Sequence, residues 1–68
     1  MTPEDMMTAM RESGFQADVS YPYIVVSLNN RPVSKIEVAS AIVKHFDISY
    51  KAIVKMLSHS ADTVLIKL

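Results

Sequence analysis

The stretch YIVVSL, residues 23–28, decides the fold because it is the strongest strand pattern in the chain. β-branched and aromatic residues dominate it, and such residues favour an extended backbone. Ile24 and Val26 alternate with Tyr23 and Val25, so both faces of this strand are apolar. Strands of that kind lie inside a sheet, and we therefore expect residues 23–28 at its centre.

Upstream of this strand, the sequence predicts a helix over residues 3–13 and a further strand over residues 15–21. Thr2 is suited to cap the helix, and Pro3 stands at its first position, where a missing N–H costs nothing. Gly14 follows where a left-handed C-cap is expected. In residues 15–21 apolar and polar side chains alternate, which is the period of a half-buried strand.

Downstream, a turn over residues 29–32 leads into a second helix that runs to Phe46. Ser34 and Glu37 form a capping box at its start, and apolar residues recur along it at steps of three and four. After a short break, Ser49 is suited to cap a third helix.

The third helix is predicted over residues 50–57, where apolar side chains recur at helical spacing. A rival interpretation makes residues 51–57 a strand paired with the last segment, and the sequence alone leaves both open. Residues 58–62 are predicted to be a polar loop. Residues 63–68 are predicted to be a strand that pairs with residues 23–28.

The 68 residues thus predict one α+β domain in the order α-β-β-α-α-β, with a three-stranded sheet that has helices on one face. Two sets of alternating side chains should form the core side of the sheet, namely Ile24, Val26, Leu28, Val64, Ile66 and Leu68. The opposite face would carry Tyr23, Val25 and Leu65.

Composition argues against catalysis. The chain has no cysteine and one glycine, so thiolate metal sites and glycine-rich phosphate loops are excluded. His45 and His59 are the only imidazoles, and no third ligand stands at a metal-binding spacing. We expect a non-enzymatic protein without metal or cofactor. Without cysteines, a long apolar run or a secretory signal, a cytoplasmic location is expected.

Charge is distributed unevenly although the net charge is zero. Residues 1–30 contain one base and four acids, a net charge of −3, whereas residues 31–68 contain six bases and three acids, a net charge of +3. Lys51, Lys55 and His59 are spaced four residues apart, as on one face of the third helix. A basic face would bind DNA or RNA phosphates, and its candidate residues are Arg31, Lys44, Lys51, Lys55 and His59. The alternative is the solvated face of an amphipathic helix.

The second and third predicted helices resemble a helix-turn-helix. Five apolar residues match the positions that fix the angle between the two helices of that family, namely Ile42, Phe46, Ile48, Ile53 and Met56. Ser49 would begin the recognition helix. Val43 and Asp47 depart from the family, which favours alanine and glycine at these two positions. The resemblance implies binding to DNA.

The predicted order of elements is also similar to that of type II KH domains, which bind single-stranded nucleic acid. Those domains clamp the nucleic-acid backbone with a GXXG loop between their consecutive helices. The corresponding residues here, 46–49, contain no glycine, so the resemblance is limited to topology.

A second class of function is a regulatory protein-binding module or inhibitor. Tyr23, Val25 and Leu65 would form an apolar sheet face, and Tyr21 would lie beside it. A small domain with such a face is typical of proteins that complete their core on a partner. The partner would be another protein or a second copy in a homodimer.

Overall fold

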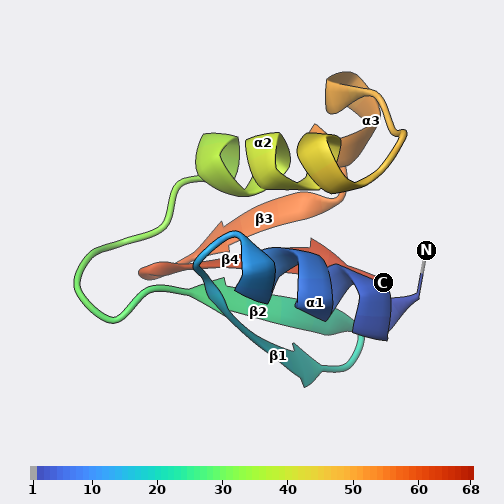
Figure 1. Ribbon diagram of the computed structural model, residues 1–68. Helices are drawn as coiled ribbons and strands as arrows, with labels where there is room; N and C mark the ends of the chain where they lie inside the picture. Colours follow the sequence, from blue (N-terminus) through green and yellow to red (C-terminus); the bar gives the residue numbers. More distant parts are fainter. Residues whose placement is uncertain (1) are drawn as a thin grey trace.

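The computed structural model describes residues 2–68 (Figure 1). Over these residues its elements are helix α1 (Pro3–Glu12), strands β1 (Gln16–Ser20) and β2 (Tyr23–Ser27), helices α2 (Lys35–His45) and α3 (Tyr50–Val54), and strands β3 (Leu57–Ser60) and β4 (Thr63–Lys67). The α+β class and the three predicted helices are confirmed.

The four strands form one antiparallel sheet in the order β1-β2-β4-β3. Strand β2 lies inside the sheet, as its apolar pattern predicts, and pairs with β4 on its second side. Each outer strand is joined to its inner neighbour by a short turn. The sheet is therefore built from two hairpins whose inner strands pair with each other.

The prediction of three strands is wrong, and so is the polar loop over residues 58–62. Residues 57–60 form β3, and a two-residue turn at Ala61 and Asp62 connects it to β4. The strand was missed because Leu57 is its only buried side chain, so its sequence is polar. Pairing with the strongly apolar β4 imposes the extended conformation, which local propensity does not supply.

Helix α3 ends at Val54, three residues earlier than predicted. The segment around it combines the two interpretations, because a short helix is followed directly by a strand that pairs with the last segment. Met56 lies in the link, where its carbonyl oxygen accepts a hydrogen bond of 2.9 Å from the N–H of Lys67. Only Ile53 of the helix is buried.

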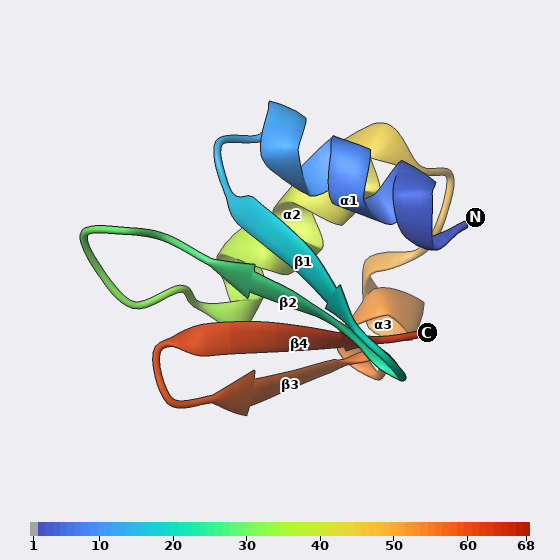
Figure 2. The ribbon, with the colours of Figure 1, turned by 90° about the horizontal axis from the view of Figure 1, so that it is seen from below.

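Helices α1 and α2 cover the same face of the sheet and leave the other face open (Figures 1 and 2). The core lies between these two helices and the sheet. Its largest fully buried side chains are Met6, Met10, Ile24, Val26, Val33, Val38, Ile42, Ile53, Val64 and Ile66. The predicted core side of β2 and β4 is thus confirmed within the strands. Beyond the strand ends it fails, since Leu28 is half-buried and Leu68 is exposed.

The predicted helix caps are present. Thr2 Oγ1 accepts a hydrogen bond of 3.1 Å from the N–H of Asp5. Ser34 Oγ accepts from the N–H of Glu37 at 3.2 Å, and the Glu37 carboxylate accepts from the N–H of Ser34 at 3.0 Å, which completes the capping box. Gly14 has a φ of +96° directly after α1, a conformation that L side chains rarely adopt.

The two nucleic-acid resemblances cover less of the structure than the sequence implies. A recognition helix lies along the major groove, but α3 has only five residues. Met56, which matches an apolar position of the helix-turn-helix, lies outside α3 altogether. The order of elements also differs from that of type II KH domains, because this chain has an additional strand, β3, between α3 and β4.

Candidate interaction surfaces

The predicted basic face does not form as a unit, and Arg31 leaves it first. The Arg31 guanidinium contacts both carboxylate oxygens of Glu37, with 2.9 Å between Nη1 and Oε2. This ion pair, together with the backbone N–H of Ser34, lowers the pKa of Glu37 from 4.5 to about 2. Because its charge is neutralised by Glu37, Arg31 is a structural residue that fastens the loop before α2.

His59 lies in β3, not on α3, so the predicted stripe of Lys51, Lys55 and His59 on one helix is wrong. Its Nε2 donates a hydrogen bond of 2.8 Å to the carbonyl oxygen of Val33. His59 therefore connects the edge of the sheet to the loop before α2. It contributes to the fold and leaves the set of phosphate-binding candidates.

Lys44 lies at a different place again, in a shallow groove of about 450 Å³ between the end of α1 and helix α2. The groove also contains the carboxylates of Glu12 and Glu37 and the ring of His45. His45 Nδ1 donates to the carbonyl oxygen of Ala41 at 3.0 Å, and its Nε2 lies 3.9 Å from Glu12. With both signs of charge present, the groove is not a phosphate site.

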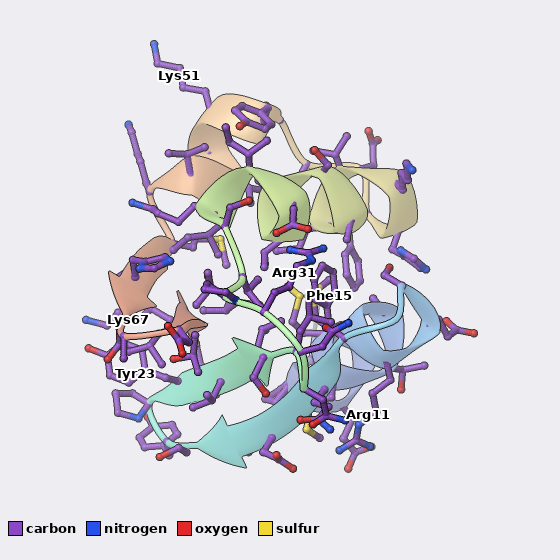
Figure 3. The ribbon with its side chains drawn as sticks, turned by 90° about the vertical axis from the view of Figure 1, so that its left-hand side faces the viewer. Arg11, Phe15, Tyr23, Arg31, Lys51 and Lys67 are labelled. Carbon is purple, nitrogen blue, oxygen red and sulfur yellow. The ribbon has the colours of Figure 1, made fainter. Side chains whose placement is uncertain are left out.

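Lys51 and Lys55 remain together on and directly after α3, where both side chains are exposed. A third lysine joins them across the sheet. Lys67 in β4 donates its N–H to Met56, the residue that follows Lys55, and it stands opposite Tyr23 in the β2–β4 register. Figure 3 shows Lys67 close to Tyr23 at one side of the sheet, whereas Lys51 extends from α3 at the top of the molecule.

Tyr21 completes this set of residues. It lies in the turn between β1 and β2 with 84% of its surface exposed. The N–H of Leu68 donates a hydrogen bond of 2.8 Å to the carbonyl oxygen of Pro22, so this turn is held against the residue after Lys67. We refer to Lys51, Lys55, Lys67, Tyr21 and Tyr23 as the lysine–tyrosine strip.

Lys67 was missed by the sequence reasoning because it is far from the other basic residues along the chain. The signal that finds it is the pairing of the last strand with residues 23–28, which the sequence does predict. In the antiparallel register that aligns Val25 with Leu65, Lys67 stands beside Tyr23. The link to Lys55 depends on β3, which the sequence does not reveal.

The open face of the sheet carries Tyr23, Val25 and Leu65, as predicted, but the expected apolar face is reduced to a small centre. Val25 and Leu65 are directly opposite each other, and both are half-buried. Around them the face carries mainly hydroxyl and amide side chains, together with one carboxylate and one ammonium: Gln16, Asp18, Ser20, Ser27, Ser58, Ser60, Thr63 and Lys67. The polar rim leaves an apolar patch of two aliphatic residues and Tyr23.

The size of this face also limits its use. Four strands about 4.8 Å apart, each about five residues of 3.3 Å, give an area of roughly 300 Å². A standard protein interface buries about 800 Å² on each partner. The open face of one copy is thus too small to hold a partner by stacking alone.

An apolar cavity of about 170 Å³ lies where the start of α1 meets the end of β4. Thr2, Pro3, Met6, Met56, Ile66, Lys67 and Leu68 line it. Within residues 2–68, no group of three or more His, Asp or Glu side chains is arranged to hold a metal ion. None of the helices in this part of the chain combines the length and hydrophobicity that a membrane span requires.

Comparison with protein-family models, with curated proteins and with solved structures found no match to this chain. The candidate surfaces must therefore be weighed on their geometry and chemistry alone.

Proposed function

We propose that this protein is a non-catalytic domain that binds single-stranded nucleic acid, DNA or RNA, along the lysine–tyrosine strip. The observation that supports this proposal is the placement of the strip's residues at one side of the sheet. Strand pairing sets Lys67 beside Tyr23, and two backbone hydrogen bonds tie the β1–β2 turn and the residue after Lys55 to the end of β4. Proteins that bind single strands combine these groups, because lysines attract phosphates and aromatic rings stack on bases.

The charges of the strip are available for phosphate. Among residues 2–68, no carboxylate lies within 4.0 Å of the ammonium groups of Lys51, Lys55 or Lys67, whereas Arg11 and Arg31 both have acidic partners. The strip therefore concentrates unneutralised positive charge on a protein whose net charge is zero. Weak binding that depends steeply on salt is expected.

A single strand fits better than a duplex. With five residues, α3 is too short to read a major groove. The exposed ring of Tyr21 needs an unpaired base on which to stack, and stacking contributes about 1–3 kcal/mol per base. Tyr23 is half-buried, so less of its ring is available to a base than in the case of Tyr21.

The test is fluorescence anisotropy with short single-stranded DNA and RNA over a range of salt concentrations. For Lys51→Gln with Lys55→Gln, the slope of log K against log salt should become shallower by about 1.4, since each phosphate contact to a single strand contributes roughly 0.7. The matched control is Lys35→Gln with Lys44→Gln, which removes the same charge from α2. It should reduce the steepness of the slope by less than the Lys51 and Lys55 pair does.

Tyr21→Ser separates stacking from charge. It should weaken binding by about 1–3 kcal/mol without changing the salt slope. Equal effects of the two lysine pairs would show that binding follows net charge and not the strip. If the wild type does not bind either nucleic acid at low salt, the proposal is overturned and a protein partner becomes the better hypothesis.

A further inference from the structure

Strand β3 leaves one border of the sheet unpaired (Figure 2). Met56 accepts its hydrogen bond from β4, so alternation turns the backbone groups of Leu57 and His59 away from the sheet. In the part of the chain that the structure describes, no residue donates to or accepts from these outward groups. Two N–H groups and two carbonyl groups are thus ready to pair with another strand.

Natural proteins discourage such pairing with charged residues, proline or a bulge on the edge strand. Residues 57–60, Leu-Ser-His-Ser, contain none of these, since the sequence has no Lys, Arg, Asp, Glu or Pro there and the register with β4 is unbroken. The β3 edge is uncharged and regular.

From this edge we infer that two copies of the chain form a dimer by antiparallel pairing of their β3 strands, which creates one continuous eight-stranded sheet. A two-fold axis at Ser58 pairs Leu57 of one copy with His59 of the other, and the reverse. This register satisfies all the outward backbone groups of both residues, with four new hydrogen bonds. Registers centred on Leu57 or His59 leave some of these groups unpaired.

The charges next to the edge favour the same register. Lys55 precedes β3 and Asp62 lies in the turn that follows it, and neither has an ion-pair partner among residues 2–68. Antiparallel pairing about Ser58 brings Lys55 of each copy to the turn that holds Asp62 of the other. The second copy is therefore complementary in both hydrogen bonding and charge, as an isologous interface requires.

Dimerisation would also enlarge the open face. Two faces of roughly 300 Å² would join in one sheet. Both lysine–tyrosine strips would lie on the same assembly, with Lys55 of each engaged by Asp62 of the other copy and Lys51 and Lys67 left for phosphate. The inference does not depend on nucleic-acid binding, because every experiment below is done without nucleic acid.

The decisive variant is Ser58→Lys, studied by sedimentation equilibrium at micromolar to millimolar protein. In the dimer Ser58 lies opposite its own copy, so two lysines would meet at the axis and the dimer should be lost. Ser58 is exposed in the single chain, so the circular dichroism spectrum and the melting temperature should stay close to the wild type. The matched control is Ser20→Lys, an exposed serine on the other edge strand, which should leave the dimer intact.

A charge exchange tests the register. Asp62→Lys alone should weaken the dimer about fivefold, as expected for the loss of two exposed ion pairs, and adding Lys55→Asp should restore most of the affinity. A sample in which half the chains are isotope-labelled should show a contact between the Ser58 Hα protons of the two copies. A wild type that remains monomeric at millimolar concentration would overturn the inference, as would a dimer that Ser58→Lys leaves intact.

Discussion

The two edges of this sheet are built differently. On β1, the outward carbonyl oxygen of Ala17 accepts a hydrogen bond of 2.7 Å from Arg11 Nη2, and the same guanidinium lies 3.9 Å from the Asp18 carboxylate. On β3, the outward backbone N–H and carbonyl groups of Leu57 and His59 have no hydrogen-bond partner among residues 2–68. One residue of α1 thus covers one outward group of the β1 edge, which also carries the charged side chain of Asp18.

The edges also differ in how they are attached to the core. Strand β3 inserts Leu57 between the sheet and the helices, and Leu57 is only 6% exposed. Strand β1 contributes Ala17, which is as well buried but has no side chain beyond Cβ. Apolar burial therefore holds β3 to the core and leaves its edge free, whereas a polar contact from α1 holds β1 and covers one of its outward carbonyl groups.

The largest expected effect comes from removing the apolar anchor of β3. Leu57→Ala should cost about 2–4 kcal/mol, because it leaves a cavity at a buried position. A 68-residue domain has only a few kcal/mol of stability to lose, so β3 should separate from the sheet. Urea unfolding measures the loss, and Ala17→Gly, expected to cost about 1 kcal/mol, is the comparison on β1. Equal losses would show that the two strands are attached alike.

Removing Arg11 should make the β1 edge resemble that of β3. Arg11→Met keeps the apolar stem and should cost about 1–2 kcal/mol, the value of a charge-assisted hydrogen bond that is partly buried. Amide hydrogen exchange at Asp18 and Ser20, whose N–H groups pair with β2, should accelerate, and self-association should increase because the outward carbonyl of Ala17 becomes free. Unchanged exchange in β1 would mean that the Arg11 contact does not hold this strand.

This difference between the edges explains how far the sequence could predict the fold. Helices α1 and α2 each have a cap and an apolar stripe, and Gly14 marks the end of α1. The central strand has its own apolar pattern, so each of these elements was predictable from local residues. Strand β3 has only Leu57 as an apolar signal. Its conformation is imposed by pairing with β4, and this pairing cannot be predicted from the local sequence of residues 57–60.

The candidate site was predictable to the same extent. Val25 and Leu65 were placed on the open face from alternation alone, and Lys51 and Lys55 were placed together from helical spacing. The roles of Arg31 and His59 were not predictable, because each depends on a specific contact, with Glu37 in one case and with the Val33 carbonyl in the other. Charge in a sequence becomes a binding surface only where no such contact neutralises it.

The turn that joins β3 to β4 should tolerate a stabilising change. Ala61 has a φ of +52°, which costs an L-residue about 1–2 kcal/mol. Ala61→Gly removes that strain but increases the entropy of the unfolded chain, so the net gain should be about 0.5–1 kcal/mol. Thermal unfolding measures it, and Ala52→Gly in α3, expected to cost about 1 kcal/mol, is the control. A loss of stability in both variants would show that Ala61 is not strained.

The smallest effect should be the acid dependence of the exposed Arg31–Glu37 pair, which provides a surface reference for the partly covered Arg11 contact. The pKa of Glu37 is lowered to about 2 in the folded protein, so folding favours the ionised carboxylate. Its contribution to stability is complete above the ordinary pKa of 4.5 and is lost as the pH falls through about 2. Solvent screens this pair, so the loss should be modest.

Glu37→Gln isolates this contribution, because glutamine has no proton to gain in this range. Urea unfolding of the wild type and the variant between pH 7 and pH 2 should show a small excess of wild-type stability at pH 7 that disappears towards pH 2. Arg11→Met should behave differently, since the Ala17 carbonyl that Arg11 binds does not titrate and its deficit should therefore persist at low pH. An excess of wild type over Glu37→Gln that stays constant down to pH 2 would mean that the ion pair with Arg31 does not stabilise the loop before α2.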